Sequence, residues 1–334
     1  MNGKRWAALG IAVFLFIGSV VINFWSSAAT TNFANFQDIL SDEEKFSEEI
    51  IEKGSSTNKI AVLTVQGVIQ DTGSATSVFQ SAGYNHRQFL EMLEHAGESN
   101  DVEGIILRVN SPGGGVVESA EIHDKIKEIQ KKHEKPIYIS MGTMAASGGY
   151  YISTPADKIY AHPSTLTGSL GVIIQSMNYG ELAEKLGVKW ETIKSGIHKD
   201  ILSPTRDMTE EERNILQSIV DNSYDQFVNV IAKGRGIPEE KVRELADGRV
   251  YDGTQAKSLN LVDELGDLED TIKSMKKKLG NSHLKVVRYE TAVGLDSFLT
   301  MTANKVLNPN NDLLGIQKLF NQTNTPQIKY LYTE

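Results

Sequence analysis

No cysteine occurs among the 334 residues of the chain. That absence excludes a disulfide framework, a thiolate nucleophile and any metal site built on cysteine ligands. Basic residues are comparatively few as well: 34 lysines and arginines stand against 43 aspartates and glutamates, for a formal net charge of -9 at pH 7. Because a nucleic-acid-binding surface needs clustered lysine and arginine, we expect no nucleic-acid partner.

Charged residues are missing altogether from residues 6–25, which read WAALGIAVFLFIGSVVINFW. About 20 consecutive apolar residues are enough for a helix to cross the hydrocarbon core of a membrane. Lys4 and Arg5 precede this stretch, and no further basic residue follows until Lys45. The positive-inside rule therefore predicts a single-pass membrane anchor, with a cytoplasmic N-terminus and the bulk of the chain outside the cytoplasm.

A cleaved signal peptide is the alternative for this stretch, with cleavage after Ala29 in the run Ser27-Ala28-Ala29. The apolar run is longer than the roughly 7–15 residues of a typical signal-peptide core, which favours a retained anchor. A buried core helix is a third interpretation. The first two both take the body of the protein out of the cytoplasm.

Strand and helix patterns alternate after a polar stretch that we interpret as a linker. Their order is typical of an α/β fold in which helices cover a parallel sheet. We divide the chain into residues 1–27 (cytoplasmic tip and transmembrane anchor), 28–57 (linker, partly helical around 42–53), 58–294 (folded domain) and 295–334 (C-terminal tail). The expected strands are 60–69, 104–110, 136–140, 158–161, 171–174 and 190–194. The expected helices are 85–96, 118–132, 145–153, 181–186, 209–233, 238–245, 254–259 and 268–279.

Two glycine-rich segments each follow an expected strand. In residues 110–116, NSPGGGV, consecutive glycines let the backbone approach a ligand and expose successive N–H groups, although a tight turn explains them as well. In residues 141–150, MGTMAASGGY, Ser147 lies among small residues at the expected start of a helix. A helix N-terminus favours a developing oxyanion. Close packing of a helix on the sheet is the competing interpretation.

A serine nucleophile needs a base. The chain has seven histidines, and none stands in a motif that connects it with Ser147. A lysine can replace histidine where burial lowers its pKa, as in Ser-Lys variants of the catalytic triad. Lys199, next to His198, lies in a loop-like segment after an expected strand. From the residues alone, a solvated surface lysine is the favoured interpretation of Lys199.

Five motifs resolve this choice by resemblance. They are SPGGG at 111–115, GTMAASGGYY at 142–151, TGSLGV at 167–172, IKSGIHKD at 193–200 and GRVYDG at 248–253. From Lys59 to about Glu264 the sequence resembles signal peptide peptidase A, in the short form found in Gram-positive bacteria. The resemblance implies a fold like that of Clp protease and crotonase.

The same resemblance implies a serine endopeptidase with Ser147 as nucleophile and Lys199 as general base. Backbone N–H groups at Gly114 and Gly148 are then expected to bind the oxyanion, and Ser169 to orient the lysine amine. No metal or organic cofactor is implied. The expected substrates are peptides, remnant signal peptides in particular, cleaved at the outer face of the cell membrane. The expected assembly is a homo-oligomer, an octamer, whose dyad is shared between neighbouring subunits.

Two other functions are compatible with the same fold. A crotonase-like acyl-CoA enzyme also uses a glycine-rich oxyanion hole, but the expected location outside the cytoplasm counts against a cytosolic carrier. A non-catalytic peptide-binding scaffold is the second, and the presence of both Ser147 and Lys199 in matching contexts counts against it. We also hypothesise that the apolar tail, residues 327–334, reaches the active-site groove as an internal substrate or plug.

Overall fold

The computed structural model describes residues 46–71, 84–291 and 328–332. By its contacts the chain divides into two units, and nearly all of the described residues lie in the second, Glu48–Glu290 with Asn310–Glu334. None of the helices in the described ranges has the length and apolar character needed to span a membrane. The expected anchor, residues 6–25, lies outside those ranges.

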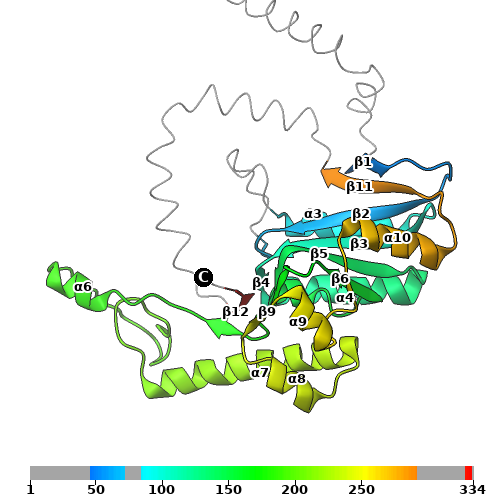
Figure 1. Cartoon of the computed structure of the whole chain (residues 1–334). Helices are drawn as coiled ribbons and strands as arrows, with labels where there is room; N and C mark the ends of the chain where they lie inside the picture. The colour runs from blue at the N-terminus through cyan, green and yellow to red at the C-terminus, as the bar shows by residue number, and fades with distance from the viewer. Residues whose placement is uncertain (1–45, 72–83, 292–327, 333–334) are drawn as a thin grey trace, which may run out of the picture. The chain divides into compact units, whose positions relative to one another are not determined.

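A mostly parallel sheet forms the centre of the fold (Figure 1). In the described residues its strands follow the order β1-β11-β2-β3-β5-β6-β10, with β7 paired to β5 and β9 paired to β7. The pairs β11–β2, β2–β3, β3–β5, β5–β6, β5–β7 and β6–β10 are parallel, and β7–β9 is antiparallel, which confirms the expected α/β fold with a parallel sheet. The strand bounds are β1 Phe46–Glu52, β2 Lys59–Gln66, β3 Val102–Ser111, β5 Ile137–Ala146, β6 Lys158–Ala161, β7 Leu166–Gly168, β9 Val250–Tyr251, β10 Glu264–Leu265 and β11 Lys285–Thr291.

Helices cover both faces of this sheet. Along β2, Ala61 and Leu63 pack in one apolar cluster with α3 and α4, whereas Ile60 and Val62 pack in a second cluster with α10. Successive side chains of a strand point to opposite faces, so the two helical layers lie on opposite sides. Burial on both faces explains why the strands read as continuous apolar runs. The helix bounds are α3 His86–Glu98, α4 Val116–His133, α5 Gly148–Tyr151, α6 Gly180–Lys185, α7 Glu210–Arg235, α8 Glu239–Leu245, α9 Gly253–Ser258 and α10 Leu268–Leu279.

A second, small sheet joins three segments that are far apart in the sequence. Its order is β4-β12-β8, with β4 at Gly113–Gly115, β8 at Ile173–Ile174 and β12 at Ile328–Leu331. The tail strand β12 pairs with both other strands, so it lies between the glycine-rich strand β4 and the short strand β8. Both pairings are antiparallel.

Three expectations about local structure are wrong. The helix expected from residue 145 begins only at Gly148, because β5 continues through Ala146 and pairs there with β7. Residues 190–194 form no strand, since they are exposed and pair with no other strand in the described ranges. Within the expected linker, residues 46–52 form the strand β1 next to β11 instead of part of a helix.

Candidate active site

Ser147 lies at the junction between a strand and a helix. β5 ends at Ala146, α5 begins at Gly148, and Ser147 between them has φ 53° and ψ -116°. A positive φ is strained for a residue with a side chain, and such strain clusters at functional sites. The Ser147 N–H donates to the Gly168 carbonyl at 2.8 Å, and the Ser147 carbonyl accepts from the Tyr151 N–H at 2.8 Å. Two backbone hydrogen bonds, one at the N–H and one at the carbonyl of Ser147, therefore stabilise the strained turn.

The hydroxyl of Ser147 is buried and unpaired. The residue is 1% exposed, and among the described residues its Oγ has no hydrogen-bond partner. A buried hydroxyl without a partner costs about 1–3 kcal/mol, so native proteins keep such groups where they serve a purpose. Presentation of a serine on a strained strand-to-helix turn is also the arrangement of the nucleophile elbow in hydrolases.

Strand β4 brings Gly114 against the first residue of α5. The Ile69 N–H donates to the Gly113 carbonyl and the Ile69 carbonyl accepts from the Gly115 N–H, both at 2.8 Å. A Cβ on Gly114 would lie 1.8 Å from the Ile69 oxygen, and a Cβ on Gly148 would lie 3.0 Å from the Gly114 nitrogen. Glycine is therefore required at both positions for the backbones to approach.

Because Gly114 and Gly148 lie close together, their backbone N–H groups place partial positive charge near Ser147. The Gly148 N–H belongs to the first turn of α5 and has no acceptor within its own helix. With the Gly114 nitrogen nearby, two backbone donors lie close to the serine, as an oxyanion hole requires. The geometry is compatible with the expected roles of Gly114 and Gly148, which stay predictions.

The tail strand β12 passes beside these glycines. In antiparallel register Tyr330 is the partner of Gly114 and Leu331 the partner of Gly113, and the Tyr332 N–H donates to the Pro112 carbonyl at 2.9 Å. The chain thus holds an extended peptide, its own, against the strand that carries the expected oxyanion donor.

Tyr330 anchors the tail strand in an aromatic pocket. Its ring is fully buried, stacks on Tyr151 at a centroid distance of 5.0 Å and contacts Phe227 at 4.6 Å. The Tyr330 hydroxyl donates to the Ser223 carbonyl at 3.0 Å. Burial raises the pKa of Tyr151 to about 12 and also raises that of Tyr330, so both phenols are neutral donors at physiological pH. The pocket therefore accepts a large aromatic side chain and satisfies its polar end.

Lys199 lies in an exposed loop and does not reach Ser147 within one chain. Its backbone N–H donates to the Gly196 carbonyl at 3.1 Å, and its side chain is exposed. Because the Ser147 hydroxyl has no partner in the described residues, the two expected catalytic side chains are not brought together by a single subunit.

Ser169 lies beside the end of the tail strand, where it lines a cavity with Leu331 and Tyr332. Its N–H donates to the Arg249 carbonyl at 2.7 Å, and its φ is 50°. The cavity has a volume of about 420 Å³ and is also lined by Gly248. The expected orientation of the lysine amine by Ser169 stays a prediction.

Two family models match the chain. The first, described as "Peptidase family S49", matches residues 129–282, and the second, described as "Clp protease", matches residues 78–178. A protein from Enterococcus faecium described as a candidate signal peptide peptidase SppA is 44% identical over 295 residues, which cover 87% of this chain and 85% of that protein. The chain belongs to peptidase family S49. It is a serine peptidase, and the resemblance to signal peptide peptidase A is confirmed.

Other members and relatives share the central part of this S49 peptidase. A candidate protease from Synechocystis sp. is 42% identical over 218 residues, 65% of this chain and 73% of its own length. Protease 4 of Haemophilus influenzae is 36% identical over 217 residues, 64% of this chain but 34% of its own length. The Clp protease match contains both Gly114 and Ser147, in agreement with the observed sheet.

One buried polar residue near Gly148 is not foreseen from the sequence. Ser119 on α4 is fully buried, and within the described residues its Oγ has no hydrogen-bond partner. A Cβ on Gly148 would lie 2.7 Å from that oxygen, so the hydroxyl points at the start of α5. A signal did exist: Ser119 occupies the apolar helical positions shared by Ile122 and Ile126, where a polar residue is unusual. In the described residues, no three histidine, aspartate or glutamate side chains gather as a metal site would require.

Proposed function

We propose that this S49 peptidase is an endopeptidase with a Ser147–Lys199 dyad, which cleaves remnant signal peptides at the outer face of the cytoplasmic membrane. One observation carries the proposal. The buried hydroxyl of Ser147 has no hydrogen-bond partner in the described residues, and it lies on a strained turn beside glycine backbone donors and a groove already filled by an extended peptide. That combination supplies a nucleophile, an oxyanion site and a peptide-binding strand in one place.

The mechanism follows from these groups. Neutral Lys199 removes the proton of the Ser147 hydroxyl, and the oxygen attacks the peptide carbonyl. The N–H groups of Gly114 and Gly148 stabilise the resulting oxyanion. The protonated lysine then gives its proton to the leaving amine, and water hydrolyses the acyl-enzyme. Ser169 orients the amine of Lys199 in this scheme.

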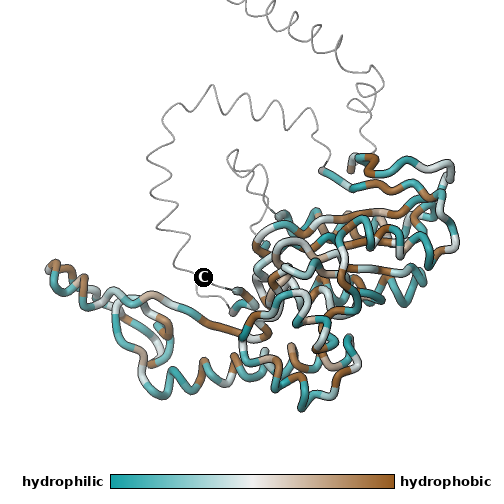
Figure 2. Tube along the Cα trace, viewed as in Figure 1, coloured by the Kyte–Doolittle hydropathy of each residue, from teal (hydrophilic) through white to brown (hydrophobic). Residues whose placement is uncertain are grey.

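The proposed dyad is completed by a second copy of the chain. Residues 173–199, which we call the arm, carry Lys199 and expose many apolar side chains. Figure 2 shows hydrophobic residues at α6, which belongs to this arm. Exposed apolar side chains that gather on one segment are typical of a protein–protein interface. The exposed apolar residues of the arm are Ile173, Met177, Leu182, Leu186, Val188, Trp190, Ile193 and Ile197. Since one chain does not bring Lys199 to Ser147, we infer that the arm packs on a neighbouring subunit of a ring, the expected octamer.

The groove favours extended peptides with a large apolar residue. Main-chain pairing with β4 and β8 is independent of sequence, whereas the pocket of Tyr151 and Phe227 selects one side chain. Remnant signal peptides are rich in such residues, and an anchor at residues 6–25 would keep the site near the membrane in which they lie.

Covalent labelling tests the proposal directly. We expect a serine-reactive phosphonate to modify the purified full chain at Ser147, identified by mass spectrometry, and to block cleavage of a fluorogenic apolar peptide. Labelling at another serine, with equal loss of cleavage, would contradict the assignment of the nucleophile.

Removal of the tail strand should raise activity toward added peptides. A chain that ends at residue 327 lacks β12, so the substrate no longer competes with Tyr330 for the pocket. Burial of one large apolar side chain is worth about 1.5–3 kcal/mol, and we expect the KM to fall about 10-fold or more, with kcat unchanged. The minimal variant Tyr330→Ala should give most of this effect. An unchanged KM in both variants would mean that β12 does not occupy the substrate groove.

A further inference from the structure

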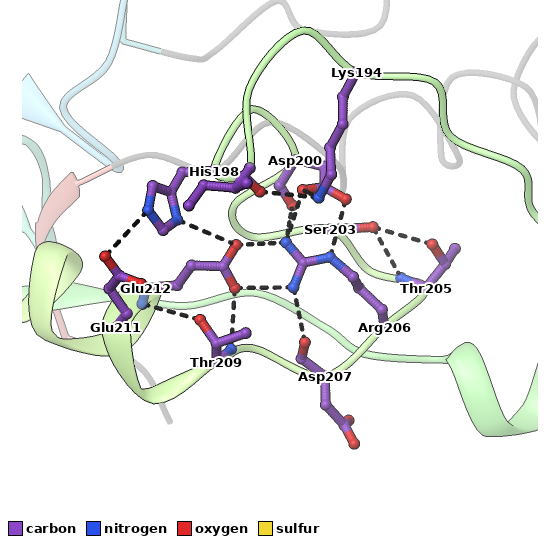
Figure 3. A network of polar contacts seen from close by, with 11 residues as sticks. Lys194, His198, Asp200, Ser203, Thr205, Arg206, Asp207, Thr209, Glu211 and Glu212 are labelled. Atoms are coloured by element: carbon purple, nitrogen blue, oxygen red, sulfur yellow. Dashed lines mark hydrogen bonds and ion pairs between the residues drawn. The ribbon is translucent and has the colours of Figure 1, made fainter.

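An ion-pair network ties the loop that carries Lys199 to the start of α7 (Figure 3). Its centre is Arg206. The Arg206 guanidinium donates to both oxygens of Asp200, at 2.9 Å from Nε and 2.7 Å from Nη2. It also donates to both oxygens of Glu212, at 2.8 Å from Nη1 and 2.5 Å from Nη2. One rigid, planar side chain thus links two carboxylates on different segments.

Glu212 is the fixed end of this network. Its side chain is 2% exposed, and it forms a capping box with Thr209 at the first turn of α7. The Glu212 carboxylate accepts from the Thr209 N–H at 3.0 Å, and the Thr209 hydroxyl accepts from the Glu212 N–H at 3.2 Å. The hydrogen bond from Arg206 and that from Thr209 lower the pKa of Glu212 to about 2. The carboxylate is therefore charged at working pH, and Arg206 and Thr209 both donate hydrogen bonds to it.

Asp200, at the other end, directly follows Lys199 in the chain. Its Oδ1 also accepts from the Lys194 ammonium at 2.6 Å, so Arg206 and Lys194 together occupy both carboxylate oxygens. These two cations hold the pKa of Asp200 well below its usual range. In the described part of the chain, by contrast, no carboxylate lies within ion-pair distance of the Lys199 amine.

This arrangement bears on the reaction because a free carboxylate beside an amine favours the charged form of the amine. A general base has to be neutral when it takes the proton. The charged and titratable groups that face the loop are Lys194, His198, Asp200, Arg206, Glu211 and Glu212, with His198 at 3.5 Å from Glu211 and 3.9 Å from Glu212. Among them, Asp200 is the acid next to Lys199 in the chain.

We propose that Arg206 is a positioning residue that holds the Asp200 carboxylate away from Lys199 and fixes the loop on α7, so that the lysine amine is presented unpaired. The inference rests on the proposed role of Lys199 as the base. Asp200 has no catalytic role in this proposal. If its carboxylate were unpaired, it would form an ion pair with the Lys199 amine and keep that amine protonated.

The test measures kcat/KM against pH for the variants Arg206→Gln, Asp200→Asn and the double variant. In Arg206→Gln, Asp200 keeps only its contact with Lys194 through Oδ1, and its Oδ2 becomes available to pair with Lys199. We expect the acid limb of the profile to move up by about one pH unit, with an activity loss of about 10-fold at neutral pH. The double variant removes the freed carboxylate and should regain most of the activity and the original profile. Asp200→Asn alone should keep the original profile.

A purely structural role of Arg206 predicts different activities and pH profiles for these variants. If Arg206 only stabilised the loop, the double variant would be no more active than Arg206→Gln and no variant would shift the acid limb; either result would overturn the proposal. Arg243→Gln is the matched control, because it breaks an arginine–carboxylate ion pair between α8 and α7, with Asp225 at 2.8 Å, outside the loop. Melting temperature and assembly size are measured for every variant.

Two further variants keep the result interpretable. If Arg206→Gln does not fold, Arg206→Lys, which retains the charge but not the planar fork, is compared with its own Asp200→Asn double variant under the same criterion. Lys199→Ala separates the two proposals. Full activity in Lys199→Ala would remove the base assignment itself, whereas an inactive Lys199→Ala together with an unshifted Arg206→Gln profile would remove only the role of Arg206.

Discussion

Replacement of Ser147 by alanine is expected to lower kcat/KM for peptide cleavage by about 10³-fold or more, the size seen when a catalytic serine is removed from a hydrolase. The residual activity would come from the oxyanion donors and peptide binding alone. The loss should lie in kcat, because the groove formed by β4 and β8 remains intact. A fluorogenic apolar peptide and a stopped time course measure both constants.

The same variant is expected to fold at least as well as the parent chain. The Ser147 Oγ has no hydrogen-bond partner in the described residues, so its removal breaks no hydrogen bond and relieves an unsatisfied buried group. We therefore expect a melting temperature equal to or higher than that of the parent, which is typical of sites that sacrifice stability for function. Loss of activity accompanied by unfolding would instead indicate a structural role.

Ser218→Ala is the matched control for this experiment. Ser218 is an exposed serine on α7 whose hydroxyl donates only to the Ile215 carbonyl of its own helix. We expect this variant to keep full activity and stability. If Ser147→Ala and Ser218→Ala cleaved peptide equally well, another residue would have to be the nucleophile.

The central sheet could be predicted from the sequence because burial on both faces leaves a local signature. Ile60, Ala61, Val62 and Leu63 alternate between two apolar clusters, so the whole run is apolar and its strand character is evident. The glycine-rich segments were equally visible, since only glycine allows backbone as close as that of Gly114 to its neighbours. These features depend on a few consecutive residues.

The incorrect strand at residues 190–194 has the converse cause. Trp190 and Ile193 are apolar but exposed in the single chain, and composition alone cannot distinguish such residues from those of a buried strand. The arm therefore has the apolar composition of a buried segment, although its apolar side chains are exposed in the single chain. That observation also supports its proposed role as an interface.

Long-range pairings were beyond the reach of sequence patterns. Tyr330 meets Gly114 across more than half of the chain, and nothing in the tail's local sequence specifies that partner. The apolar residues of the tail suggest that it reaches the groove, and the structure places Tyr330 beside β4. Its register and its aromatic pocket follow only from the assembled fold.

Mixing two inactive variants is expected to restore activity if the dyad is shared between subunits. Ser147→Ala subunits retain Lys199, and Lys199→Met subunits retain Ser147, so a site at a mixed interface can contain one intact copy of each residue. In a closed ring assembled at random from equal amounts, about a quarter of the sites would be intact. We therefore expect about a quarter of the parent kcat per subunit, with an unchanged KM.

The design of the mixing experiment isolates the interface. The two variants are co-expressed as full chains with different affinity tags, and sequential purification selects rings that contain both. Each variant purified alone provides the baseline, and a mixture combined after assembly, which leaves each ring uniform, provides the matched control. Recovery only in co-assembled rings would require Lys199 of one subunit to act on Ser147 of its neighbour. No recovery in verified mixed rings would mean that Ser147 and Lys199 of each site come from the same chain, because every site would then lack one of the two residues.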